Sequence, residues 1–155
     1  MQGNLTKFRV ISLTLAIWCA NCSAQADAGS VDTVKTVAGL MGISKVDRMR
    51  IDSVTFTVQL AGYDFDKLYG LRYLYYTESG SRDRPSGRVL MEDFIGGASD
   101  TPSIALYDFR KGRPEVVQIT DKLDVENVRW RPDAVLLEVD DQWYEFKRGK
   151  LSRLN

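Results

Sequence analysis

The sequence contains no histidine, and its only two cysteines, Cys19 and Cys22, lie near the N-terminus. Histidine and cysteine supply the usual general base at neutral pH, the thiolate nucleophile and most zinc ligands. A Ser-His-Asp triad is therefore impossible, and no G-x-S-x-G, S-x-x-K, G-x-G-x-x-G or Walker motif occurs. These absences argue against an enzyme.

The chain also lacks an apolar run long enough to span a bilayer, which takes about 20 residues. Its apolar run at residues 10–20 follows Lys7 and Arg9 and precedes Ala24-Gln25-Ala26. Positive charge, a short apolar run and small residues in this order are typical of a secretory signal. We therefore predict that residues 1–26 are removed near Ala26, and that no transmembrane segment remains.

Cleavage at that position would leave residues 27–155 as a single exported domain, periplasmic or secreted, that contains no cysteine and no disulfide. A lipid anchor is a less favoured alternative. Cys22 follows Asn21 and Cys19 follows Trp18, whereas lipidation sites have a small residue before the cysteine.

Neither sign of charge is in excess, because the chain has 21 basic and 21 acidic residues. Lys7 and Arg9 would leave with the signal, so 19 basic residues would face 21 acidic ones, a formal charge of −2. A nucleic-acid partner requires a basic field. Near-neutral charge and export therefore argue against one.

Short runs of β-branched and aromatic residues, separated by Gly, Pro, Asp and Lys clusters, fill most of the chain. From Ser103 to Leu154 these runs and turns alternate, which is typical of antiparallel strands joined by tight turns. Residues 54–60 alternate apolar and polar, and 68–78 and 88–95 are further strand candidates. We predict about eight or nine strands in an all-β or β-dominated fold, mainly an antiparallel meander that forms a small sandwich or barrel.

Two stretches and one resemblance qualify this prediction. Val31, Val34, Ala38 and Met41 recur at helical spacing and predict at most one short N-terminal helix, with a strand as the alternative because β-branched residues and glycines weaken a helix. The period-two pattern slips near Asp52-Ser53, which predicts a bulge.

The C-terminal hairpins resemble one β-propeller blade. We expect room for at most about two four-stranded blades, and propellers typically need four, so we reject a propeller.

Carboxylates leave one catalytic alternative open. Four glutamates on or beside predicted strands could meet across a sheet and supply the acid and base of a hydrolase: Glu92, Glu126, Glu138 and Glu145. Acidic side chains on the outward faces of strands are also what solubility alone requires.

Two aspartate pairs suggest calcium, but neither has the further oxygen ligands that a calcium loop needs. Asp64 and Asp66 are followed directly by a lysine and a leucine. Asp140-Asp141 lies between two predicted strands, where short polar side chains favour a tight turn. We therefore predict no metal site and no cofactor.

Tyrosines and arginines give the best candidate for a binding site. Residues 68–78 are apolar on both faces, so they form either a central strand covered on both sides or a strand whose outer face binds a partner. The polar loop at 79–87 carries arginines, and Tyr and Arg are common in protein interfaces. The predicted contact face comprises Tyr69, Tyr73, Tyr75, Tyr76, Arg82, Arg84 and Arg88. In the alternative, these arginines are solvated hairpin ends, and Trp130 and Trp143 are core residues.

These features predict an exported, non-catalytic protein-binding domain of the bacterial envelope. It would act as an inhibitor, an immunity-type antidote to a toxin, or an accessory subunit. The alternative is a carboxylate-dependent hydrolase or a binding module that acts on envelope polysaccharide.

Overall fold

The structure is a computed structural model that describes residues 31–46, 54–96, 101–120 and 123–155. These residues form twelve strands and no helix, which confirms the predicted all-β fold and exceeds the expected strand number. The strands are β1 (Asp32–Thr36), β2 (Gly39–Lys45), β3 (Phe56–Leu60), β4 (Tyr63–Leu68), β5 (Arg72–Thr77), β6 (Arg88–Phe94), β7 (Ser103–Asp108), β8 (Glu115–Thr120), β9 (Asn127–Arg131), β10 (Ala134–Val139), β11 (Gln142–Lys147) and β12 (Lys150–Arg153).

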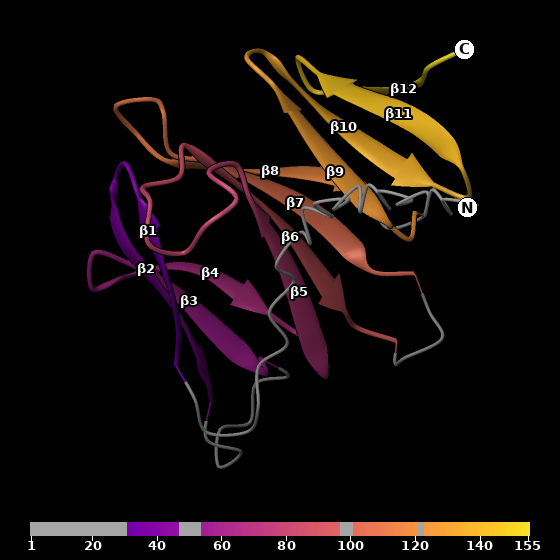
Figure 1. Ribbon diagram of the computed structural model, residues 1–155. Coiled ribbons are helices and arrows are strands. Elements are labelled where there is room, and N and C mark those ends of the chain that lie inside the picture. Colours follow the sequence, from indigo (N-terminus) through magenta and orange to yellow (C-terminus); the bar gives the residue numbers. More distant parts are fainter. Residues whose placement is uncertain (1–30, 47–53, 97–100, 121–122) are drawn as a thin grey trace, which may run out of the picture.

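The strands form three four-stranded antiparallel sheets, each a meander of consecutive strands. Sheet A comprises β1–β4, sheet B β5–β8 and sheet C β9–β12, and sheet B lies between the other two (Figure 1). Each sheet therefore has the strand order of a propeller blade. The estimate of at most two such units is wrong, because strands of only four to seven residues and tight turns fit three units into residues 32–153. The sheets stack as three layers.

Three hairpins use two-residue turns in which both residues have positive φ: Ala61-Gly62, Asp140-Asp141 and Arg148-Gly149. Positive φ at both positions defines the type I′ turn, whose twist matches that of the flanking strands. Asp140-Asp141 therefore forms the tight turn predicted from the sequence, with φ values of 50° and 58°.

The N-terminal helix prediction is wrong, because residues 32–45 form the hairpin of β1 and β2. Val34 and Met41 are directly opposite each other in this hairpin and are both fully buried. Their helix-like spacing arises from two strands that each alternate with period two, separated by a turn in which Gly39 has a φ of 124°. The bulge predicted near Asp52-Ser53 lies outside the described residues.

Two hydrophobic cores hold the layers together, and sheet B contributes to both. Core AB, between sheets A and B, contains Val58, Tyr73 and Tyr107, among others. Core BC, between sheets B and C, contains Leu90 and Leu137, among others. Every residue of β6 is buried, so β6 is the central strand of the molecule.

The outward faces of the terminal sheets carry many polar side chains. On sheet A, the Ser44 and Thr57 hydroxyls lie 3.1 Å apart. On sheet C, the Arg129 guanidinium stacks over Trp143 at 4.3 Å and Arg131 pairs with Glu145. Trp143 was expected in the core and instead lies on this outer face, whereas Trp130 packs against core BC. Polar end faces allow an open stack to terminate in water.

Candidate functional site

Three of the four tyrosines of the predicted contact face are buried. Tyr73 and Tyr75 are 1% exposed in core AB, and Tyr76 is 8% exposed in core BC. The strand at 72–77 is thus covered on both faces, which was the other reading of its apolar faces, although it is the edge strand of sheet B and not a central one. These three rings are not available to a partner in this conformation.

Arg88 is also buried, at 1% exposed, and connects sheet B to sheet C. Its Nη1 donates to the Ala134 carbonyl at 3.1 Å, and its Nη2 donates to the Arg131 carbonyl at 2.5 Å and to Glu78 at 2.6 Å. Its guanidinium lies 5.1 Å from the Trp130 ring centroid. Arg88 is therefore a structural tie, and its inclusion in the contact face is corrected.

Tyr69, Arg82 and Arg84 are exposed, but they do not share a surface. Tyr69 precedes β5 and the two arginines follow it, and a six-residue strand is about 20 Å long. Arg82 lies 3.4 Å from Asp32, and Arg84 donates to the Ser79 carbonyl at 2.6 Å. The structure thus separates the remaining members of the predicted face.

The four candidate catalytic glutamates lie in three different surroundings. Glu92 is buried beneath sheet C. Glu138 accepts a hydrogen bond from Asn127, and Glu145 pairs with Arg131 on the outer face of sheet C. Glu126 is exposed on the segment before β9. Glu138 and Glu145 are thus diagonal neighbours on adjacent strands of sheet C, whereas Glu92, on β6, lies apart from them.

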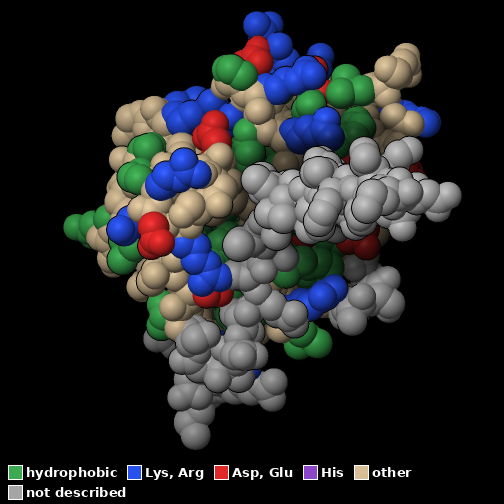
Figure 2. All heavy atoms as spheres, viewed as in Figure 1, with side chains coloured by type: hydrophobic (Ala, Val, Ile, Leu, Met, Phe, Trp, Pro, Cys, Tyr) green, Lys and Arg blue, Asp and Glu red, His purple; other side chains and the backbone are tan. Residues whose placement is uncertain are grey.

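Several exposed apolar side chains lie together where the hairpins of sheets A and B end, whereas Leu71, Val31 and Ile95, which are 72%, 61% and 56% exposed, lie elsewhere. Tyr63 is 79% exposed, and Val37, Leu40 and Val116 are 57%, 53% and 39% exposed. A cleft of about 500 Å³ between the β3–β4 hairpin and the β7–β8 turn is lined by Tyr63, Val116 and Arg113. We call Val37, Leu40, Tyr63, Arg113 and Val116 the hairpin-end surface. Figure 2 shows hydrophobic and basic side chains next to each other where these hairpins lie.

Local backbone geometry builds this surface. The Ala61-Gly62 turn places Tyr63 at its exit, and the Ala61 amide donates to the Leu40 carbonyl at 2.8 Å, which holds two hairpins together. The Val37 amide donates to the Ser86 carbonyl at 3.1 Å. The loop that carries Arg82 and Arg84 therefore lies beside the β1–β2 turn. A tyrosine directly after a tight Ala-Gly turn was the available sequence signal, and it was missed.

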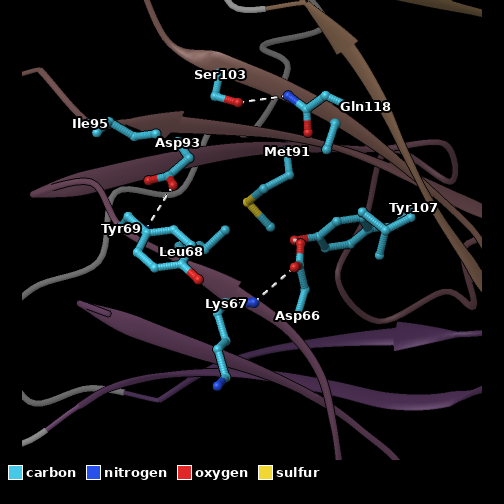
Figure 3. Close-up of a pocket in the computed structure, with 12 residues that line it drawn as sticks. Asp66, Lys67, Leu68, Tyr69, Met91, Asp93, Ile95, Ser103, Tyr107 and Gln118 are labelled. Carbon is cyan, nitrogen blue, oxygen red and sulfur yellow. Dashed lines mark hydrogen bonds between the residues drawn. The ribbon is translucent and has the colours of Figure 1, made fainter. Parts of the chain in front are cut away.

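A second cavity, of about 210 Å³, opens between β4 and sheet B (Figure 3). Asp66 and Asp93 line it from the two sheets. Asp66 accepts a hydrogen bond from the Tyr107 hydroxyl at 2.7 Å. Asp93 accepts hydrogen bonds from the Tyr69 and Gly70 amides at 2.8 and 2.7 Å. A Cβ at Gly70 would lie 2.3 Å from the Asp93 Oδ1, so only glycine fits there.

Burial dominates the electrostatics of this second cavity. Burial raises the pKa of Asp93, and the negative charge of Asp66 raises that pKa further. The two hydrogen bonds from the Tyr69 and Gly70 amides lower the pKa but do not outweigh burial. Burial also raises the pKa of Tyr107 well above its usual value. The Lys67 side chain points away from the cavity in Figure 3. The Tyr69 ring, 46% exposed, is the aromatic group at this site that solvent can reach.

Within the described ranges, no three or more acidic side chains gather in a way that could hold a metal ion. The part of the chain that the structure describes also contains no helix long and apolar enough to cross a membrane. No protein-family model, curated protein or solved structure matches this chain.

Proposed function

We propose that this chain is an exported, non-catalytic protein-binding domain of the bacterial envelope, which acts as an inhibitor, an antidote or an accessory subunit. One observation carries the proposal: the hairpin-end surface exposes four apolar side chains at neighbouring hairpin ends, and two of them, Tyr63 and Val116, line a cleft together with Arg113. Clustered exposed apolar groups are typical of interaction sites. Tyrosine and arginine are also enriched among the residues that contribute most to binding.

The chain contains its own matched control. Tyr63 lies at the hairpin end of sheets A and B, and Tyr69 lies at the far end of β4 beside the second cavity. Both rings are exposed, so truncation of either one should leave the core intact. Only Tyr63 belongs to the proposed surface.

The test is an affinity capture of residues 27–155 from native envelope extract, with wild type, Tyr63→Ala and Tyr69→Ala compared by mass spectrometry. We expect wild type and Tyr69→Ala to retain the same stoichiometric protein, and Tyr63→Ala to lose it at an unchanged melting temperature. Capture of nothing by wild type, or equal loss in both variants, would contradict the proposal.

Export is tested separately, by N-terminal sequencing of the protein isolated from the periplasm, which should give a sequence that begins at Asp27. Full-length protein found only in the cytoplasm would contradict export.

A second candidate is a module that binds envelope polysaccharide at the cavity between β4 and sheet B. The observation in its favour is the combination of the accessible Tyr69 ring with the Asp66 and Asp93 carboxylates. Aromatic rings stack on sugar rings, and carboxylates accept hydrogen bonds from sugar hydroxyls. Calorimetric titration with peptidoglycan-derived oligosaccharides would detect it. Here the roles reverse: Tyr69→Ala should abolish binding and Tyr63→Ala should not.

A further inference from the structure

Glu92 is a buried carboxyl that neither candidate surface uses. It is 1% exposed and lies on the face of β6 toward core BC, where residues 123–126 lead from sheet B into sheet C. The Val125 amide donates to its Oε1 at 3.4 Å. The Tyr76 hydroxyl lies 3.4 Å from Glu92 Oε2 and 3.2 Å from the Val125 carbonyl oxygen. We call this unit of Glu92, Tyr76 and the Val125 backbone the Glu92 clamp.

Whether every hydrogen-bond acceptor in the clamp has a donor depends on whether Glu92 is protonated. A tyrosine hydroxyl has one hydrogen, and here two acceptors compete for it. If Glu92 is ionised, either its Oε2 or the Val125 carbonyl lacks that donor, and a buried acceptor without a donor costs free energy. If Glu92 is protonated, it donates to the Tyr76 oxygen, and Tyr76 donates to Val125. The neutral form therefore satisfies every group.

The distances show no short bond that would hold Glu92 in its ionised form. Hydroxyl donors to ionised carboxylates typically lie at about 2.5–2.7 Å. The Tyr107 hydroxyl is 2.7 Å from Asp66 and the Tyr73 hydroxyl 2.9 Å from Asp32, whereas the Tyr76 hydroxyl is 3.4 Å from Glu92. Glu92 is the only one of these three acids that faces core BC.

The surroundings of Glu92 also favour proton uptake. Burial is the largest cause that raises the pKa of Glu92, to about 7, and the charge of Asp124 adds to it. The hydrogen bonds from Val125 and Tyr76 and the charge of Arg72 act in the opposite direction. From β7, the residue paired with Glu92 is the uncharged Ile104. Among the described residues, Asp124, Arg72 and Tyr76 are thus the titratable or charged groups that act on it.

We propose that the Glu92 clamp is a proton-controlled latch between sheets B and C, closed when Glu92 is neutral and loosened when it ionises. This regulation goes beyond the proposed binding function and does not depend on it. The folded chain binds this proton more tightly than the unfolded chain does. The latch is therefore strongest below about pH 4.5, weakens as pH rises to about 7, and changes no further above that.

Amide hydrogen exchange at Val125, followed by NMR between pH 5 and 8.5, tests the latch directly. In wild type, the protection factor should fall as pH rises, by about 75-fold between pH 5 and 8.5, out of the roughly 300-fold total that corresponds to a pKa change from 4.5 to about 7. Glu92→Gln keeps a neutral group of the same shape, so its protection factor should not vary with pH. Glu126→Gln removes an exposed charge from the same segment and should behave like wild type.

A pH-independent protection factor in wild type would overturn the latch, and so would the same fall in Glu92→Gln. If Glu92→Gln does not fold, titration of the Glu92 carboxyl carbon in wild type decides the question. A midpoint near 7 supports the latch, and one near 4.5 overturns it.

Discussion

The two interfaces between the three sheets are built from different chemistry. Core AB is aromatic: Phe56 and Tyr73 meet edge to face at 4.8 Å, and Phe65 and Tyr107 do so at 5.3 Å. Two of its tyrosine hydroxyls donate to carboxylates on sheet A, Tyr73 to Asp32 at 2.9 Å and Tyr107 to Asp66 at 2.7 Å. Sheets A and B are therefore joined by rings whose polar ends bind side chains.

Core BC is aliphatic, with Leu90, Ile104 and Leu137 fully buried, but two ionisable side chains of sheet B, Arg88 and Glu92, are also buried on this side. Arg88 donates to two carbonyls beside the β9–β10 turn, and Glu92 accepts the Val125 amide. Side chains of sheet B thus bind the backbone of sheet C and of the segment that leads to it. Backbone groups cannot move to find new partners, so this interface should tolerate the loss of a polar side chain less well than core AB.

Of the substitutions that test this difference, Arg88→Met should lower the free energy of unfolding the most. Methionine fills a similar volume, but it leaves the Arg131 and Ala134 carbonyls without their donor and Glu78 without its ion pair. Loss of one partner of a buried ion pair costs about 3–5 kcal/mol. We expect a reduction of this size in the free energy of unfolding, measured by urea denaturation.

Arg84→Met is the matched control, because Arg84 lies in the same loop region but is exposed. Its free energy of unfolding should change by about 0.5 kcal/mol or less. Equal effects of the two substitutions would mean that Arg88 does not tie sheet C to sheet B.

The difference between Arg84 and Arg88 also marks the limit of what the sequence could predict. Strands and turns follow from local patterns, so residues 103–154 and the Asp140-Asp141 turn were predicted correctly. Both arginines flank the same polar loop, and nothing local distinguishes the buried one from the exposed one. That distinction depends on sheet C, which packs against sheet B from about 40 residues further along the chain.

The tyrosines of β5 show the same limit. The alternation of side chains along β5 places Tyr73 and Tyr75 on one face and Tyr76 on the other. Whether a face is covered depends on how many sheets stack, and the residues that the structure describes form three sheets where at most two four-stranded units were expected. Tyr63 was missed for the complementary reason: its exposure follows from its place at the exit of a hairpin at the end of the stack.

Gly70→Ala probes the close approach of the chain to β6 at the rim of core AB. The new methyl group would lie 2.5 Å from the carbonyl carbon and oxygen of Phe94, and this backbone cannot rotate away. Overpacking of this kind costs about 1–3 kcal/mol. We expect a loss within that range in urea denaturation. Gly112→Ala is the control, because no atom lies within 4 Å of its added Cβ; a similar loss there would show that the Gly70 effect is not steric.

The smallest expected effect compares the same substitution at both interfaces. Tyr73→Phe removes a hydroxyl from core AB, and Asp32 keeps Arg82 as a partner at 3.4 Å. Tyr76→Phe removes the hydroxyl that bridges Glu92 and the Val125 carbonyl in core BC. Loss of a typical hydrogen bond costs about 1 kcal/mol, whereas a buried group left unsatisfied costs about 1–3 kcal/mol.

We therefore expect Tyr76→Phe to lower the free energy of unfolding more than Tyr73→Phe does, in urea denaturation at pH 7. Both variants keep the ring, so packing is nearly constant and the comparison isolates the hydroxyl. If Tyr73→Phe lowered the free energy of unfolding more than Tyr76→Phe, the polar contacts of core AB would contribute at least as much to stability as those of core BC. Backbone binding by sheet B would then not explain how sheet C is held.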